Sequence, residues 1–212
     1  MRDGEEPALI AGIVREVAAR HGVDARRIFV AGLSAGAAMA VVMGQVYPEV
    51  FAGVGAHSGL PYASAHDIPS AMAAMKGGRG RAGGLASGSA LATATRHAVP
   101  TIVFHGDRDH TVQHDNGVHI VNQANKAFRD ERKGAPLQSS THRATSPGGR
   151  SYSRTVHADS EGAATIELWT LHGAGHAWSG GDARGSYTDG GGPDASAEMI
   201  RFFLALPRAG SA

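Results

Sequence analysis

The sequence of 212 residues contains no cysteine, and its Lys and Arg residues outnumber its Asp and Glu residues by only 20 to 19. Without cysteine the chain can form no disulfide, no thiolate metal site and no cysteine nucleophile. The near balance of charge provides no broad basic field of the kind that favours nucleic acids or anionic membranes. We therefore expect no nucleic-acid partner and a ligand that is small or neutral.

Long apolar runs are also absent. No stretch approaches the roughly 18 consecutive apolar residues that a membrane-spanning helix needs, and charged residues follow Met1 where a secretory signal would have its apolar core. Hydrophobic residues nevertheless make up 42% of the chain and charged residues 18%, which excludes a disordered polyelectrolyte. The sequence predicts a single packed domain over 1–212 outside the membrane, cytoplasmic if Met1 is the natural start and secreted if a leader precedes it.

Apolar residues alternate between the spacing of strands and the spacing of helices. Five segments have the pattern of strands: 27–31, 51–56, 100–104, 151–157 and 164–171. Four segments repeat apolar residues at helical spacing: 5–21, 35–47, 116–128 and 195–206. Strands separated by helices predict an α/β fold with a mostly parallel sheet. The glycine-rich segment 77–89 is expected to be a flexible loop.

The pentapeptide Gly32-Leu33-Ser34-Ala35-Gly36 joins a predicted strand to a predicted helix. A G-x-S-x-G turn in this context needs small residues beside a serine whose backbone is strained and whose hydroxyl points outward. The pattern therefore predicts Ser34 as a nucleophile and the amide of Ala35, at the start of the helix, as an oxyanion donor. The same letters in a glycine-rich chain also occur in ordinary turns.

A serine of ordinary pKa needs a base and a group that orients the base. In α/β hydrolases the chain order is serine, acid and histidine, each after a strand. The predicted strand 100–104 leads to Asp107 and Asp109, and the predicted strand 164–171 leads to His172 and His176.

One residue of each pair is favoured. Asp109 lies deeper in its loop than Asp107 and so reaches farther toward a histidine. His176 is favoured over His172 because two glycines make its loop adaptable. We then expect Asp107 to cap the turn and His172 to have a structural role.

Histidines also raise the question of a metal. Four of them crowd 105–119, and His110 and His114 have the four-residue spacing of helical metal pairs. This pair precedes the predicted helix, however, and no third ligand stands at a recognised spacing. No nucleotide-binding glycine motif follows a strand either. We expect neither a metal nor another cofactor.

Taken together, these motifs resemble the esterases of the polyhydroxybutyrate depolymerase family, relatives of the feruloyl and acetylxylan esterases. The resemblance covers nearly the whole chain except 77–89 and 133–149. Its most specific segments are RIFVAGLSAGAAMA, VGAHSGLPY, PTIVFHGDRDHTV and ELWTLHGAGHAWSGG. It implies an α/β-hydrolase-type three-layer sandwich that hydrolyses small esters or polyesters without a cofactor.

The resemblance also assigns roles to residues. It makes a catalytic triad of Ser34, Asp109 and His176. It lines the ester-binding cleft with His57, Ser58 and Trp178. For Trp178, a packing role is an equal alternative on the sequence alone.

One departure from the family is large. Several strands precede the nucleophile strand in the family, together with a loop that supplies a second oxyanion amide, whereas one helix precedes it here. We expect an N-terminally shortened sheet whose nucleophile strand lies at an open edge, where two copies would pair. With the Ala35 amide as the single oxyanion donor, we expect weak activity. A truncated core that binds or assembles without catalysis, and an acyltransferase or thioesterase with the same triad, are the alternatives.

Overall fold

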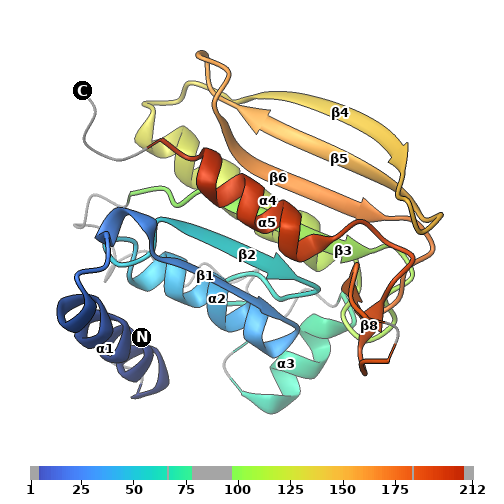
Figure 1. Ribbon diagram of the computed structural model, residues 1–212, viewed down its shortest axis with the longest axis horizontal. Coiled ribbons are helices and arrows are strands. Elements are labelled where there is room, and N and C mark those ends of the chain that lie inside the picture. Colours follow the sequence, from blue (N-terminus) through green and yellow to red (C-terminus); the bar gives the residue numbers. More distant parts are fainter. Residues whose placement is uncertain (1–4, 66, 78–96, 183, 208–212) are drawn as a thin grey trace.

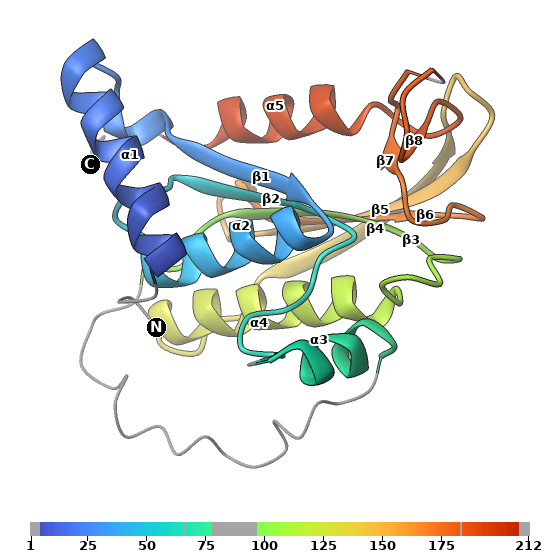
Figure 2. The same cartoon turned by 90° about the horizontal axis from the view of Figure 1, so that it is seen from below.

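The computed structural model describes residues 5–65, 67–77, 97–182 and 184–207 of the chain. Helices cover both faces of a central sheet, which makes three layers (Figures 1 and 2). The loop expected at 77–89 lies outside the described residues apart from Gly77. No described helix combines the length and the apolar character that crossing a bilayer requires.

The central sheet contains these strands: β1 (Phe29–Leu33), β2 (Gly53–His57), β3 (Thr101–Gly106), β4 (Gln138–Thr145), β5 (Ser151–Ala158) and β6 (Ala164–Leu171). Their order across the sheet is β1-β2-β3-β6-β5-β4. The first four in this order run parallel, whereas β5 is antiparallel to β6 and β4 is antiparallel to β5. The four parallel strands therefore end at the same edge, where ligands of open α/β sheets bind.

The helical elements are α1 (Glu5–His21), the short 3₁₀ helix η1 (Ala25–Arg27), α2 (Ala35–Val46), α3 (Ile68–Met75), α4 (Asp115–Glu131) and α5 (Ala195–Ala205). Helices α2 and α4 cover one face of the sheet and α5 covers the other (Figure 2). A second, two-stranded sheet pairs β7 (Trp178–Ser179) with β8 (Thr188–Asp189).

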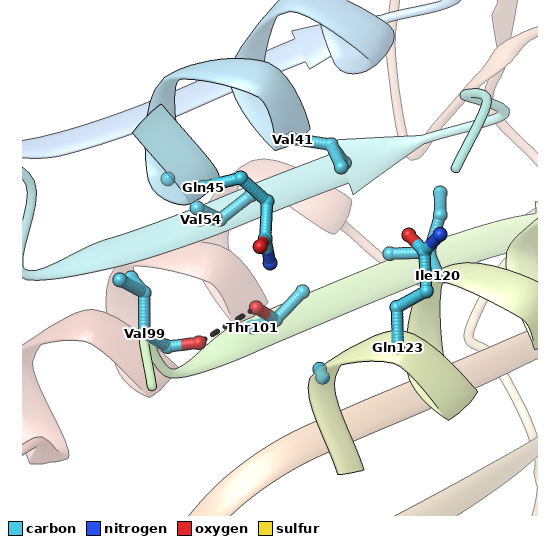
Figure 3. Close-up of a pocket in the computed structure, with 9 residues that line it drawn as sticks. Val41, Gln45, Val54, Val99, Thr101, Ile120 and Gln123 are labelled. Carbon is cyan, nitrogen blue, oxygen red and sulfur yellow. Dashed lines mark hydrogen bonds between the residues drawn. The ribbon is translucent and has the colours of Figure 1, made fainter. Parts of the chain in front are cut away.

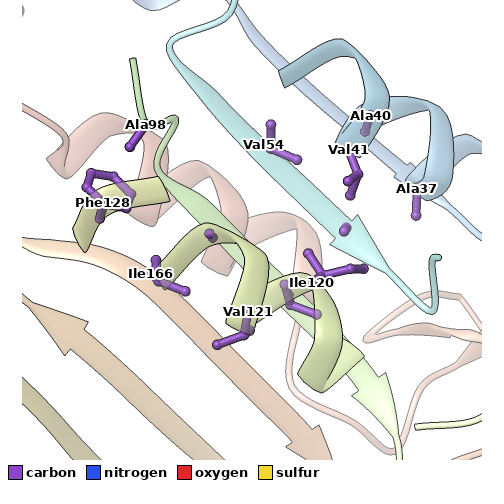
Figure 4. Close-up of a cluster of buried hydrophobic side chains, with 12 residues drawn as sticks. Ala37, Ala40, Val41, Val54, Ala98, Ile120, Val121, Phe128 and Ile166 are labelled. Carbon is purple, nitrogen blue, oxygen red and sulfur yellow. The ribbon is translucent and has the colours of Figure 1, made fainter. Parts of the chain in front are cut away.

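The sheet divides the apolar core in two. On one side, Val41 of α2 and Ile120 of α4 pack over Val54 of β2 (Figure 4). On the other side, Phe202 of α5 packs against Phe104 of β3. Each helix is thus held to the sheet by its buried apolar stripe, which fixes the position of the loops at the strand ends.

Besides the short elements η1, β7 and β8, helix α3 and strand β4 were not expected from the sequence. Helix α3 begins with a capping box in which the Asp67 side chain accepts from the Ser70 N–H and the Ser70 hydroxyl accepts from the Asp67 N–H. Strand β4 consists of exposed polar residues apart from Ala144, which is half-buried. Because it lies at the edge of the sheet, β4 is held by its ladder with β5 and carries no apolar pattern.

The nucleophile strand lies at the opposite edge, as expected. Among the described strands, β1 has a neighbour only in β2. Ala31 in the middle of β1 is exposed.

Candidate active site

The turn between β1 and α2 holds Ser34 in a strained conformation. Its φ is 58° and its ψ is −117°, outside the regions that residues with a side chain prefer. The turn is tight, because a Cβ added to Gly32 would lie 2.4 Å from the carbonyl carbon of Gly36. This is the geometry of a nucleophile elbow, and it sets Ser34 at the N-terminal end of α2.

The first residue of α2 is Ala35, which is exposed. No carbonyl within the helix can accept the N–H of a first helical residue. The Ala35 amide is therefore free to donate to an oxyanion formed beside Ser34.

The structure brings Asp109 and His176 together. Nδ1 of His176 donates to Oδ2 of Asp109 at 2.7 Å, and the Asp109 side chain is fully buried while that of His176 is 12% exposed. The other carboxylate oxygen accepts the N–H groups of Thr111 at 2.9 Å and Val112 at 2.8 Å. These bonds fix the carboxylate, which in turn orients the imidazole and leaves its Nε2 free to take a proton.

Ser34, Asp109 and His176 follow strands that end at one edge of the sheet. No hydrogen bond joins the Ser34 hydroxyl to His176 within the described ranges. Catalytic bonds of this kind are often long before a substrate is bound.

The backbone and the ring of His57 contact two different parts of the site. Its carbonyl accepts the N–H of Ser34 at 2.9 Å. Burial, helped by the nearby charges of His105 and His176, lowers the pKa of His57 to about 3. The ring of His57 also stacks on Trp178, so the residue that holds the backbone of Ser34 contacts the segment that follows His176.

His57 and Ser58, which the resemblance assigned to the ester-binding cleft, are both fully buried in this structure. The His57 ring stacks on Phe104 at 5.8 Å and on Trp178 at 5.2 Å between ring centres. Its Nε2 accepts the N–H of Ser179 at 3.1 Å, so its Nδ1 carries the proton and donates to the Ser58 hydroxyl. The segment after His176 covers these side chains, and no local pattern around His57 reveals a cover 122 residues away.

Trp178 is half-buried. Besides its stack on His57, its indole Nε1 donates to the hydroxyl of Ser196 at 3.1 Å. These contacts are packing contacts, and the half-buried residue keeps some exposed surface beside the loop of His176.

The alternative acid and base contact each other. Nδ1 of His172 donates to Oδ2 of Asp107 at 2.9 Å, and the N–H of Gly173 donates to Oδ1 at 2.7 Å. Sequence reasoning did not pair these residues. A signal was available, since His-Gly ends β3 and also directly follows β6, and these strands are neighbours with Gly106 opposite Leu171.

The described residues contain no group of three or more His, Asp or Glu side chains that could hold a metal ion. Two histidines of the crowded segment have other contacts: Nε2 of His105 donates to the carbonyl of Val112 at 2.8 Å, and Nε2 of His114 lies 3.1 Å from the hydroxyl of Thr170.

A small cavity of about 20 Å³ lies between α2, α4 and the sheet (Figure 3). Val54 and Thr101 line its floor, and Gln45 and Gln123 lie on opposite sides. Its volume has room for about one water molecule and is too small for an ester. None of its lining residues belongs to the loops of Ser34 or His176.

Residues 1–132 match the protein family described as Esterase PHB depolymerase. The chain is 33% identical over 179 residues to poly(3-hydroxyalkanoate) depolymerase C of Paucimonas lemoignei, in an alignment that covers 82% of this chain and 41% of that protein. It is 38% identical over 60 residues to feruloyl esterase B of Talaromyces funiculosus, which covers 28% of this chain and 17% of that protein. The chain thus spans less than half the length of these relatives.

Solved structures of esterases share the fold. An acetyl xylan esterase from Aspergillus awamori superposes with a TM-score of 0.62 at 19% identity, covering 94% of this chain and 67% of that one. A PHB depolymerase from Penicillium funiculosum superposes with a TM-score of 0.58 at 19% identity, covering 88% and 54%. The three-layer sandwich with a mostly parallel sheet is therefore of the α/β-hydrolase type, as expected.

Proposed function

This chain belongs to the Esterase PHB depolymerase family, and from that premise we propose that it is a serine carboxylic-ester hydrolase that forms an acyl-enzyme on Ser34. The observation that carries the proposal is the 2.7 Å hydrogen bond between His176 and the buried carboxylate of Asp109. It supplies an oriented base at the sheet edge where the strained turn exposes a serine.

The reaction proceeds in two halves. In the first, Nε2 of His176 takes the proton of Ser34 as the serine Oγ attacks the ester carbonyl carbon, and Asp109 stabilises the imidazolium that forms. The amide of Ala35 donates to the oxyanion. The bond to the alcohol oxygen then breaks, and His176 returns the proton to this leaving group.

In the second half, His176 takes a proton from water, whose oxygen attacks the acyl carbon. The bond to Ser34 Oγ breaks, the serine regains its proton from His176, and the carboxylic acid leaves. His176 takes and returns each proton in this scheme, and the Ala35 amide contributes a hydrogen bond to the oxyanion.

As substrates we propose small esters and polyesters. One relative is named as a poly(3-hydroxyalkanoate) depolymerase, and a solved PHB depolymerase of the same fold is described as complexed with an R3HB trimer. Both names support a hydroxyalkanoate ester as the first substrate to test.

We further propose that activity is weak in this chain alone. The amide of Ala35 supplies one oxyanion donor. Hydrolysis in a site that lacks one of its oxyanion donors is typically slower by about 10²- to 10³-fold.

Two copies are proposed to associate through the edge of β1. No other described strand pairs with this edge on its outer side, and helices α1 and α5 carry exposed apolar residues. The largest are Leu9 and Ile13 of α1 and Ile200 and Leu204 of α5, which are 64%, 53%, 57% and 56% exposed.

The test of the activity is hydrolysis of p-nitrophenyl butyrate by the wild type, by Ser34→Ala and by Ser139→Ala. Ser139 is exposed on β4 and serves as the matched control. We expect hydrolysis by the wild type and by the control, and a loss of roughly 10³-fold or more in Ser34→Ala. No hydrolysis by the wild type, or the same rate in Ser34→Ala, would contradict the proposal and favour a non-catalytic core. Clearing of a polyester suspension then separates polymer from small-ester substrates.

A further inference from the structure

The loops that carry the proposed acid and base rest directly on each other. We call residues 106–112 the acid loop and residues 172–178 the histidine loop. The N–H of Arg108 in the acid loop donates to the carbonyl of Ala174 in the histidine loop at 3.0 Å. A Cβ added to Gly106 would lie 2.3 Å from the same carbonyl oxygen, so only glycine permits this approach.

Asp107 is the side chain of the acid loop that contacts the start of the histidine loop. One of its carboxylate oxygens accepts from the ring of His172 and the other from the N–H of Gly173, at 2.9 and 2.7 Å. The far side of the His172 ring, Nε2, accepts from the hydroxyl of Ser153 on β5 at 2.8 Å. The ring is therefore held on both sides, and its tautomer is set by the acceptor-only carboxylate.

The charge of Asp107 suits this role. Partial burial raises the pKa of Asp107, but the hydrogen bonds from His172 and Gly173 outweigh that effect and hold the pKa below its ordinary value. The carboxylate is thus ionised at neutral pH and accepts at both oxygens at once.

The end of the histidine loop has a separate anchor. The N–H of Ser179, which directly follows the loop, donates to the buried ring of His57. The loop leaves its first anchor at Gly173, which has a φ of 74°, and then passes through Gly175, around which an added Cβ would meet nothing within 4 Å. Glycines have no side chain to pack, so the path of this segment depends on its anchors.

We propose that Asp107 is a positioning residue for His176, because its bonds to His172 and Gly173 set the start of the loop that brings the His176 ring onto Asp109. The inference rests on the proposed role of His176 as the base. Asp107 itself touches no reacting atom and transfers no proton.

The test is the variant Asp107→Asn. It keeps the size of the side chain, but only one oxygen remains to accept a hydrogen bond in place of the two carboxylate oxygens. We expect kcat for p-nitrophenyl butyrate to fall roughly 10- to 100-fold, because small displacements of a catalytic group cost this much, while KM changes by less than about twofold. In proton NMR, the low-field resonance of the His176–Asp109 hydrogen bond should move or broaden. Ser139→Ala on the exposed strand β4, which leaves all contacts of Asp107 and His172 in place, should keep the wild-type kcat and resonance.

A folded Asp107→Asn protein with an unmoved resonance would overturn the inference, whatever its kcat. If that variant does not fold, His172→Gln retains the bond from Gly173 and should still shift the resonance; an unmoved resonance there would also overturn it. The resonance can be recorded without turnover. A wild type without esterase activity would contradict the proposed function, and the resonance would still decide whether Asp107 positions His176.

Discussion

At the scale of single residues, burial separates two histidines that look alike in the sequence. His57 is fully enclosed and held neutral between aromatic rings, so it supports the backbone of the site. His176 has a carboxylate on one side and is 12% exposed, so its other nitrogen is accessible for proton transfer. The chemistry of each ring follows from its contacts.

The buried state of His57 predicts a dependence of stability on pH. Burial lowers the pKa of His57 to about 3 in the folded chain, from its ordinary value of 6.5. Between these values the unfolded chain binds a proton that the folded chain does not. The free energy of unfolding therefore falls as pH falls from 6.5 toward 3, by up to about 1.4 kcal/mol per pH unit, and this contribution is complete above pH 6.5.

Urea unfolding at pH 7.5 and pH 5.0 measures this effect, and the midpoint should be lower at pH 5.0. Burial also lowers the pKa of His105, so His57→Asn should reduce the difference between the two midpoints without abolishing it. His110 is exposed, and His110→Asn should leave the difference unchanged. An equal difference in His57→Asn and the wild type would refute the assignment.

At the scale of elements, a buried carboxylate ties β6 to its neighbours. Glu167 of β6 is fully buried and accepts from Arg154 of β5 at 2.7 and 3.0 Å and from Arg201 of α5 at 2.7 and 2.9 Å. Trp169 also donates to it, at 3.0 Å. Burial raises the pKa of Glu167, but these hydrogen bonds lower it by more, so the net pKa is below its ordinary value.

Glu167→Gln should lower the free energy of unfolding by about 1.5–3 kcal/mol, the range for hydrogen bonds to charged groups. The loss stays below that of a fully buried ion pair because the two arginine side chains are 31% and 40% exposed and can turn to water. Urea unfolding at neutral pH measures it, with the exposed Glu161→Gln as the control. A change below about 0.5 kcal/mol would mean that the network is not stabilising.

How much the sequence predicts also depends on the element. Strands β2 and β3 are buried at every residue, so their apolar runs are visible in the sequence. Strand β4 has no buried residue and shows no such run. The loops of Ser34, Asp109 and His176 were predictable because each follows one of the apolar strands. The cover over His57 was not, because it depends on packing between distant segments.

At the scale of the whole molecule, the position of β1 predicts self-association. A dimer through this edge would give a mass twice that of the chain in light scattering at micromolar concentration. Ile13→Lys places a charge on the exposed apolar face of α1 and should yield a monomer, whereas Met72→Lys on α3 should not. A monodisperse monomer of the wild type would contradict the proposed dimer.

The chain spans 41% of the length of its depolymerase relative, yet its parallel strands carry a nucleophile elbow, an oriented histidine and a buried acid in the order of a serine hydrolase. The central claim is that the acyl group forms on Ser34. A phosphonyl fluoride modifies an activated serine without needing a particular ester, and mass spectrometry of the digested protein locates the adduct. We predict an adduct on the peptide containing Ser34 that is absent in Ser34→Ala. An unmodified Ser34, or an adduct on Ser153 beside His172 in its place, would contradict the proposed acyl-enzyme on Ser34.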